Sequence, residues 1–306
     1  MRVGYASDSG TDDAVQQGQS TMRPNQYFGQ ATAMRENTRR NSKLAIILLA
    51  ASFAVAACVP ATQEEVAMGN DYAQQVEREL PIIRDPDIAR YINVLGDSIA
   101  RVSDDRDLTW RFNVVDQPEI NAFAVPGGHI YIYRGLIEKS TNMSELAGVL
   151  GHEIAHVTQR HSMQQMAKAQ RANIGLTGLC LFVPSACQGV AGAVVQVGAQ
   201  AGFAKFSRDD EASADKFGVT YVTRAGIDPR GMPSMFRILI AERARNPSGV
   251  DAFFASHPIE ESRVANTEAE ISKIDPVVIK SLTRDTRAFQ TFKLRLSGLP
   301  RTPARR

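Results

Sequence analysis

The sequence has almost no excess of charge, few cysteines and histidines, and no internal repeat. Its 306 residues carry 35 basic and 33 acidic side chains, a net charge of +2, which gives no reason to expect nucleic acid as a partner. Without a repeat there is no sign of a helical-repeat docking domain. Only three cysteines and five histidines occur, so their positions carry much of the chemical information. Hydrophobic residues make up 43% of the chain, enough for a sizeable core.

The apolar run of residues 44–57 is too short to cross a membrane comfortably. A basic stretch precedes it, and small residues follow directly before Cys58, which is the outline of a secretory signal peptide. The last residues, Val55–Cys58, resemble a bacterial lipobox, in which the cysteine is lipidated and becomes the first mature residue. We therefore expect a lipoprotein signal peptide over residues 34–57, a lipidated tether over 58–62, and one folded domain with a short C-terminal helical tail over 63–306.

Residues 1–33 are polar and lack hydrophobic periodicity, so we expect them to be disordered, or untranslated with Met34 as the true start. The signal places the mature protein in the periplasm with a lipid anchor in a membrane. By resemblance to bacterial sorting rules, the absence of Asp after Cys58 favours the outer membrane. An uncleaved N-terminal anchor with an incidental cysteine is the alternative.

An extracytoplasmic location permits disulfides. Cys180 and Cys187 are close enough in sequence to close a small loop, and we predict a disulfide between them. Two buried thiols are the alternative.

Hydrophobic spacing predicts an α+β domain that is mainly helical, with a small antiparallel sheet beside the helix that carries the chemistry. Alternation predicts three strands, over residues 110–115, 120–125 and 129–133. Residues 174–204 fit either a buried helix pair or a mobile lid. Helical periodicity covers residues 64–80, 88–102, 142–166, 207–225, 233–244, 260–273 and 286–296.

Residues 151–157 contain the pattern H-E-x-x-H on a predicted helix. His152 and His156 lie one turn apart on the same face, so both can turn a ring nitrogen to one metal ion. Glu153 lies beside them on an apolar face, where a carboxylate is costly unless it is paired or acts on a metal. A purely structural helix, with His161 as a third histidine, is the weaker interpretation.

Zinc fits two neutral imidazoles and one carboxylate, with a fourth position left for water. We choose Glu211 as the third ligand and expect one Zn²⁺ per chain. Asp215 lies one turn beyond Glu211 and can accept the free N–H of a ligating histidine, which orients that ring. Asp209 and Asp210 are rival ligands, but neither has a partner at the same spacing.

These ligands predict hydrolysis of peptide bonds. Glu153 would take a proton from the attacking water as general base and pass it to the leaving amine. The developing oxyanion needs a further donor, for which His257 and Arg263 are candidates. His257 could instead fill the open position of zinc and hold the enzyme inactive, or could be a plain loop histidine.

Taken together, these motifs resemble the gluzincin family that includes the CAAX-prenyl endopeptidase and the periplasmic β-barrel assembly-enhancing protease. The resemblance covers roughly residues 64–297. It implies a zincin-like fold, zinc at His152, His156 and Glu211, and Glu153 as the catalytic base. The matching pieces, in the order of the family, are Asn121–Gly128, Gly151–His161, Glu211–Asp215 and Ser256–Pro258.

The resemblance also implies that Asn121, Ala122, Phe123 and Ala124 form an edge strand beside the cleft. A substrate strand could pair with it through main-chain hydrogen bonds, which tolerates many sequences. Simple core packing is the alternative for Phe123.

The substrates implied are misfolded or stalled envelope proteins, including outer-membrane barrels, with a link to the barrel-assembly machinery. The chain departs from the barrel-assembly protease by lacking a long C-terminal repeat domain, which weighs against docking to that machinery. It also lacks the multiple spans of the integral-membrane members, which weighs against prenylated substrates.

Quality-control proteolysis in the envelope is therefore the leading interpretation. The alternative is a chaperone-like outer-membrane assembly factor that keeps the zinc fold with little or latent proteolysis. The intact Glu153 argues for an enzyme, because a protein that only binds does not need the general base. A structural zinc is a third alternative, and such sites usually close with a fourth protein ligand.

Overall fold

The computed structural model describes residues 62–104, 106–168 and 206–302, all of them within one compact unit, Ala56–Arg306. The predicted signal peptide, the Cys180–Cys187 disulfide and the 174–204 segment lie outside these residues. None of the described helices combines the length and the apolarity that a membrane span requires.

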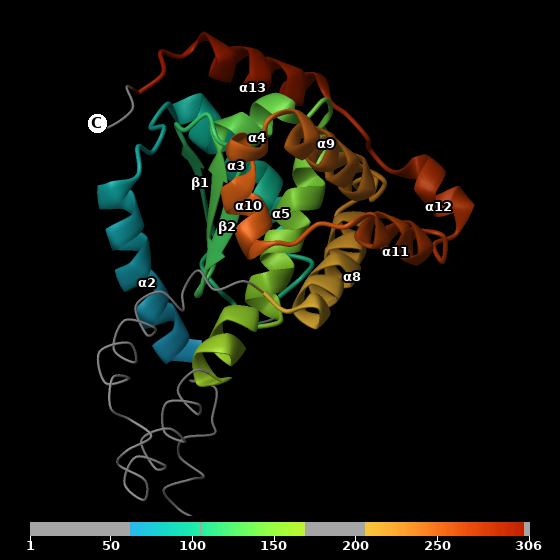
Figure 1. Cartoon of the computed structure of the whole chain (residues 1–306), viewed down its shortest axis with the longest axis horizontal. Coiled ribbons are helices and arrows are strands. Elements are labelled where there is room, and N and C mark those ends of the chain that lie inside the picture. Colours follow the sequence, from blue (N-terminus) through green and yellow to red (C-terminus); the bar gives the residue numbers. More distant parts are fainter. Residues whose placement is uncertain (1–61, 105, 169–205, 303–306) are drawn as a thin grey trace, which may run out of the picture. The chain divides into compact units, whose positions relative to one another are not determined.

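The described residues are mainly helical, with one small sheet, as predicted (Figure 1). Three short helices, α4, α10 and α12, were not predicted, because six residues are too few for a periodic pattern to show. The helices are α2 (Thr62–Glu79), α3 (Pro86–Ala100), α4 (Arg134–Lys139), α5 (Met143–Thr158), α8 (Arg208–Arg224), α9 (Gly231–Arg245), α10 (Asp251–Ser256), α11 (Glu261–Ile271), α12 (Pro276–Ser281) and α13 (Arg287–Gly298). The strands are β1 (Arg111–Val115), β2 (Ala122–Val125) and β3 (His129–Tyr133).

The sheet is mixed, which corrects the predicted antiparallel arrangement. Its order is β1-β3-β2, with β3 antiparallel to β2 and parallel to β1. A tight turn joins β2 to β3, and Gly127 and Gly128 supply its positive φ angles of 81° and 100°. The chain passes from β1 to the far edge before β2 begins, and β3 then fills the gap between them. The alternation of side chains along the sequence predicts where the strands are, but not which strands pair with each other in the sheet.

The two faces of the sheet bury different groups of side chains. Phe112, Ile130 and Ile132 face the main core, which contains α3 and α5, whereas Val115 and Tyr131 face α2. This division follows from the period of two along a strand. It places α5 on one side of the sheet and α2 on the other, with β2 as an edge strand of the sheet within the part of the chain that the structure describes.

The active-site helix is shorter than predicted. It starts at the predicted cap, since Asn142 accepts a hydrogen bond from the backbone N–H of Glu145. It ends at Thr158, not at residue 166, because Arg160 adopts a left-handed φ of 57°. The Arg160 side chain is bound to the buried Glu65 of α2 at 2.8 Å, and a second helical stretch follows at residues 161–168. No glycine or proline marks this break in the sequence.

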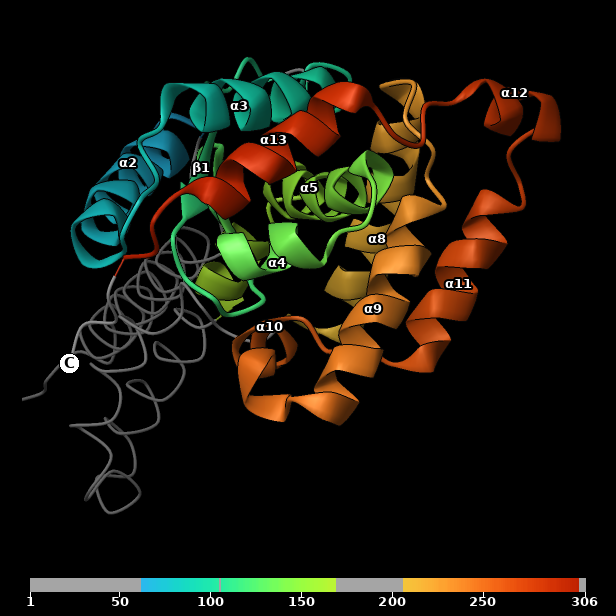
Figure 2. The same ribbon diagram turned by 90° about the horizontal axis from the view of Figure 1, so that it is seen from above.

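The C-terminal helix α13 lies across α3 and α4 and is held by a buried cation (Figure 2). Arg134 donates to Asp116 at 2.9 Å and to the carbonyl oxygens of Leu296 and Leu299 at 2.5 and 2.8 Å. The pKa of Asp116 is lowered, because the bonds from Arg134 and Thr302 outweigh the effect of burial, which raises it. The tail is thus an integral part of the domain.

Helices α5 and α8 pack closely along a pair of glycines. A Cβ atom on Gly218 would lie 3.1 Å from the backbone of both Gly151 and His152, and one on Gly151 would lie 2.8 Å from Val222. Both distances are shorter than ordinary van der Waals contacts. Because α5 carries the two motif histidines and α8 carries Glu211, this contact sets the distance across the candidate site.

We predict that Gly218→Leu destabilises the domain by about 1–3 kcal/mol or more, because the side chain would force α5 and α8 apart. Leucine is a good helix former, so helix propensity is not the cause. The matched control is Gly298→Leu, since a Cβ atom there meets nothing within 4 Å. Denaturant unfolding of both variants tests this, and equal stabilities would contradict the packing argument.

Candidate active site

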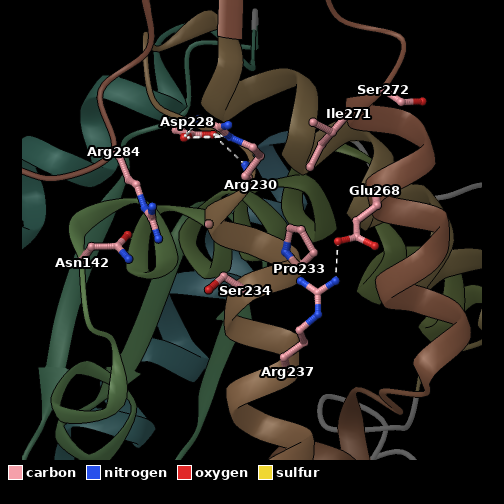
Figure 3. Close-up of a pocket in the computed structure, with 11 residues that line it drawn as sticks. Asn142, Asp228, Arg230, Pro233, Ser234, Arg237, Glu268, Ile271, Ser272 and Arg284 are labelled. Atoms are coloured by element: carbon pink, nitrogen blue, oxygen red, sulfur yellow. Dashed lines mark hydrogen bonds and ion pairs between the residues drawn. The ribbon is translucent and has the colours of Figure 1, made fainter. Parts of the chain in front are cut away.

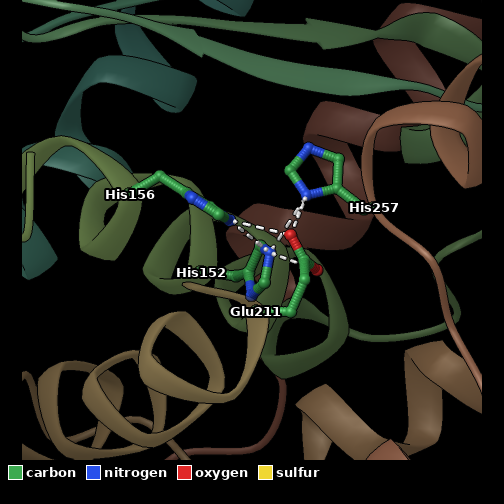
Figure 4. A group of neighbouring side chains, drawn as sticks. All are labelled: His152, His156, Glu211 and His257. Atoms are coloured by element: carbon green, nitrogen blue, oxygen red, sulfur yellow. Dashed lines mark hydrogen bonds and ion pairs between the residues drawn. The ribbon is translucent and has the colours of Figure 1, made fainter. Parts of the chain in front are cut away.

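Four side chains from three elements converge beneath the sheet edge (Figure 4). His152 and His156 come from α5, Glu211 from α8, and His257 from the residue that ends α10. One ligand atom from each lies within 4.8 Å of the others, and all four side chains are buried. This is the one such group of at least three metal-binding side chains among the residues described.

The donor atoms face one another at short range. The Nε2 atoms of His152 and His156 are 3.0 Å apart, and His156 Nε2 is 3.3 Å from Glu211 Oε1. His257 Nδ1 lies 3.1 Å from Glu211 Oε1 and 3.3 Å from His152 Nε2. Three ring nitrogens and a carboxylate converging in this way form the donor set that zinc prefers. The residues therefore fit the metal that their sequence pattern predicts.

Neighbouring side chains contact the Nδ1 atoms of His152 and His156 and so orient the two rings. Asp215 Oδ1 lies 2.9 Å from His152 Nδ1, which leaves Nε2 of that ring for a metal. His161 Nδ1 lies 3.0 Å from His156 Nδ1, and the Phe206 ring lies 3.9 Å from the His156 ring. Sequence reasoning assigned Asp215 this position but gave none to His161 or Phe206. In the sequence, the closeness of His161 to the motif was the one indication of its role, and nothing indicated a role for Phe206.

Arg263 joins the two carboxylates of α8. Its Nε and Nη2 atoms donate to Asp215 at 2.8 and 2.7 Å, and Nη1 lies 2.5 Å from Glu211 Oε2 and 3.0 Å from the Pro258 carbonyl. The guanidinium therefore faces acceptors of its own chain. This geometry favours a positioning role and counts against the predicted role as oxyanion donor.

Glu153 lies beside this network, next to His257. Its side chain is fully buried, and neither carboxylate oxygen has a hydrogen-bond partner among the described residues. The nearest cationic candidate is His257 Nε2, 3.6 Å from Glu153 Oε1. A buried carboxylate without a hydrogen bond is costly, so the presence of Glu153 beside the ligands fits a group that acts on a metal and its water.

The local charges suit metal binding. Burial keeps the pKa of His156 well below its usual value, which favours the neutral imidazole that binds metals. Burial alone would raise the pKa of Glu211, but the neighbouring His257 and His156 outweigh it and lower that pKa. Burial would likewise raise the pKa of Asp215, and Arg263 with His152 lowers it. Both carboxylates are thus held in the charged form.

The rival ligands lie elsewhere. Asp210 accepts from the backbone N–H and hydroxyl of Ser207 at 3.1 and 2.7 Å, which closes a capping box at the start of α8. Asp209 is exposed. Asp210 thus caps the start of α8, whereas Glu211 faces α5.

The predicted substrate-binding segment lies beside this group. Asn121 directly precedes β2, and Ala122, Phe123 and Ala124 belong to it. A pocket of about 320 Å³ reaches from this segment to His257.

A separate pocket of about 480 Å³ lies between α9, α11 and the start of α5 (Figure 3). Two of its arginines are already paired, Arg230 with Asp228 and Arg237 with Glu268. None of the four converging side chains lines it, so we place the chemistry at the His152 group.

Comparison with known proteins identifies the family of the chain. The model of peptidase family M48 matches residues 84–271, which contain all four converging side chains. The chain is 33% identical over 242 residues to the beta-barrel assembly-enhancing protease of Escherichia coli (strain K12), covering 77% of this chain and 49% of that protein. The same figures hold for the protein of that name from Yersinia pestis.

A more distant similarity links the chain to a mitochondrial enzyme. The mitochondrial metalloendopeptidase OMA1 of Schizosaccharomyces pombe is 27% identical over 179 residues, which cover 58% of this chain and 51% of that protein. The chain spans about half the length of the curated relatives it matches. The family match covers more than half of this chain and includes the whole metal-binding group. The chain therefore belongs to peptidase family M48, whose members are zinc metallopeptidases.

Proposed function

We propose that this chain is a membrane-tied periplasmic zinc endopeptidase that cuts misfolded or stalled envelope proteins. The single observation that carries the enzymatic part is the buried Glu153, which has no hydrogen-bond partner among the described residues and lies beside a complete His-His-Glu ligand set. A protein that used zinc only for structure would have no need of that carboxylate. The envelope part is supported by the lipobox-like Val55–Cys58 and by relatives named for β-barrel assembly.

The roles of the residues follow from their positions. His152, His156 and Glu211 would hold zinc, which would supply polarisation of the scissile carbonyl and acidification of the attacking water. Glu153 receives the proton of that water and hands it to the leaving amine. Its burial strengthens this role, because an apolar site keeps competing water away from the base. Asp215 fixes the His152 ring, and Arg263 fixes Asp215 and Glu211.

The open edge of β2 supports an extended substrate. The Tyr133 N–H donates to the Asn121 carbonyl, so the residues facing β3 alternate as Asn121, Phe123 and Val125. The backbone groups of Ala122 and Ala124 therefore point away from the sheet. A substrate strand can pair with them only if its own backbone is extended and unpaired. Unfolded segments meet that condition and folded domains do not, which favours misfolded proteins as substrates.

His257 supports the alternative of a latent or chaperone-like protein. Its Nδ1 atom lies within the ligand group, where it could fill the position that water needs. Burial alone would lower the pKa of His257, but the Glu153 and Glu211 carboxylates outweigh it and raise that pKa. The same ring could also serve as an oxyanion donor once displaced. The two roles predict opposite effects of removing it.

We predict that Glu153→Gln lowers casein cleavage by about 10²- to 10⁴-fold, the usual contribution of a general base. Zinc content should stay at one ion per chain, because Glu153 is not a ligand. Metal analysis and a casein assay on the purified protein measure both. The control is Glu260→Gln, an exposed carboxylate that should change neither. Full activity in Glu153→Gln would contradict the assignment of the base.

Removing the Asp215 charge should weaken zinc binding. Asp215→Asn keeps the shape but loses the charge that orients His152, and we expect zinc affinity to fall by about 10- to 100-fold. Asp209→Asn on the same helix is the matched control, because that carboxylate is exposed. Competition with a zinc chelator gives the affinities. Equal affinities for the two variants would remove the positioning role of Asp215.

Removing the His257 ring distinguishes latency from catalysis. If His257 blocks the open position, His257→Ala should increase casein cleavage severalfold at unchanged zinc content. Ser262→Ala, an exposed serine on α11, is the control. A loss of activity with zinc retained would contradict the latent state and favour the oxyanion role for His257.

A further inference from the structure

A pocket of about 320 Å³ lies between the edge strand and α10, next to the metal-binding group. One end of it is closed by His257, whose Nδ1 atom belongs to the ligand group. Its walls are largely apolar and come from four elements. They are formed by Val76 and Leu80 near the end of α2, Phe123 of β2, Tyr133 of β3, and Ala252 and Ala255 of α10.

The pocket runs along the β2 edge, and three of its lining residues, Val76, Phe123 and Tyr133, belong to the α2 side of the sheet. Phe123, Tyr131 and Tyr133 share that face, and the Phe123 ring is stacked on Tyr131 at 5.0 Å. Side chains of a strand that adds to β2 alternate between the two faces of the sheet. Every second substrate side chain therefore points to the α5 side, and those between point to the α2 side. A substrate side chain on the α2 side, near the metal-binding group, faces this pocket.

We infer that this pocket is a specificity subsite that takes one large apolar or aromatic side chain of the extended substrate. The inference rests on the proposed endopeptidase function. Three aromatic rings, those of Phe123, Tyr133 and Phe206, and short alanine side chains leave space for a ring and surround it with apolar atoms, which is the usual character of a side-chain pocket. The proximity of His257 places that substrate residue close to the bond that is cut.

The polar groups of the pocket refine its preference. Asn121 lines it, and the Oδ1 atom of this residue is buried without a hydrogen-bond partner in the part of the chain that the structure describes. That atom can accept a hydrogen bond, so the pocket suits Tyr and Trp as well as Phe, Leu and Met. Glu79 also lines the pocket and disfavours Asp and Glu through its like charge.

The α10 alanines offer a direct way to change the preference. Ala255 is exposed, so a larger side chain there occupies the pocket without entering the core. Ala255→Phe should lower cleavage beside aromatic residues relative to cleavage beside alanine by about tenfold or more, since a small change in a side-chain pocket has this effect. Leu80→Ala should act in the opposite sense and shift the preference toward Trp and Tyr.

The test is a digest of a proteome-derived peptide library by the purified full-length protein, with the cleavage sites read by mass spectrometry. We expect one position near the cut to be enriched in large apolar residues and depleted in acidic ones. In Ala255→Phe that enrichment should move to Gly, Ala and Ser. The matched control is Ala288→Phe, an exposed alanine on α13 outside this pocket, which should keep the wild-type profile.

Each outcome is informative. A wild-type profile without preference at any position overturns the subsite and leaves the endopeptidase standing. So does a clear wild-type preference that neither Ala255→Phe nor Leu80→Ala alters. If no variant and no wild-type protein cuts any peptide, the proposed function fails and the subsite fails with it.

Discussion

The close packing of α5 against α8 is the constraint on which the rest of the structure depends. Gly151 and Gly218 remove the side chains that would hold these helices apart. The contact lies beside His152 and two turns along α8 from Glu211, so ligands far apart in sequence come within a few ångströms. Side chains on packed helices are held more firmly than those on loops, which suits a site that must keep its geometry through each reaction.

The buried charges around the site form one connected network. Glu211 and Asp215 lie on successive turns of one helix, where their like charges would repel in the absence of a cation. Arg263 lies against both and is buried with them. A buried charge without such partners costs several kcal/mol, and the network offsets this cost for the anionic ligand Glu211. Glu153 meets this network through His257 at 3.6 Å and has no hydrogen-bond partner among the described residues, which distinguishes the base from the ligands.

Helix α10 connects the metal-binding group with the proposed substrate pocket. His257 ends this helix and enters the ligand group, while Ala252 and Ala255 on the same helix line the pocket. A side chain that enters the pocket therefore contacts the element that positions His257. The pocket and His257 thus share one short helix.

The sequence by itself determined the local chemistry. The four-residue spacing of His152 and His156, the adjacent Glu153, and the Glu211–Asp215 pair follow from helix geometry, which depends on neighbours along the chain. The same holds for the predicted strands and the longer helices. The short helices and the break at Arg160 escaped prediction, because their causes are contacts such as the Arg160–Glu65 ion pair.

Only the tertiary structure decided which side chains meet. It placed His257 among the ligands, His161 behind His156, and Arg263 against two carboxylates instead of toward a substrate. It also set β3 between its two neighbours, which made the sheet mixed and left β2 at the edge. These outcomes depend on how distant segments pack, and packing depends on complementary shapes across the core that no local pattern encodes.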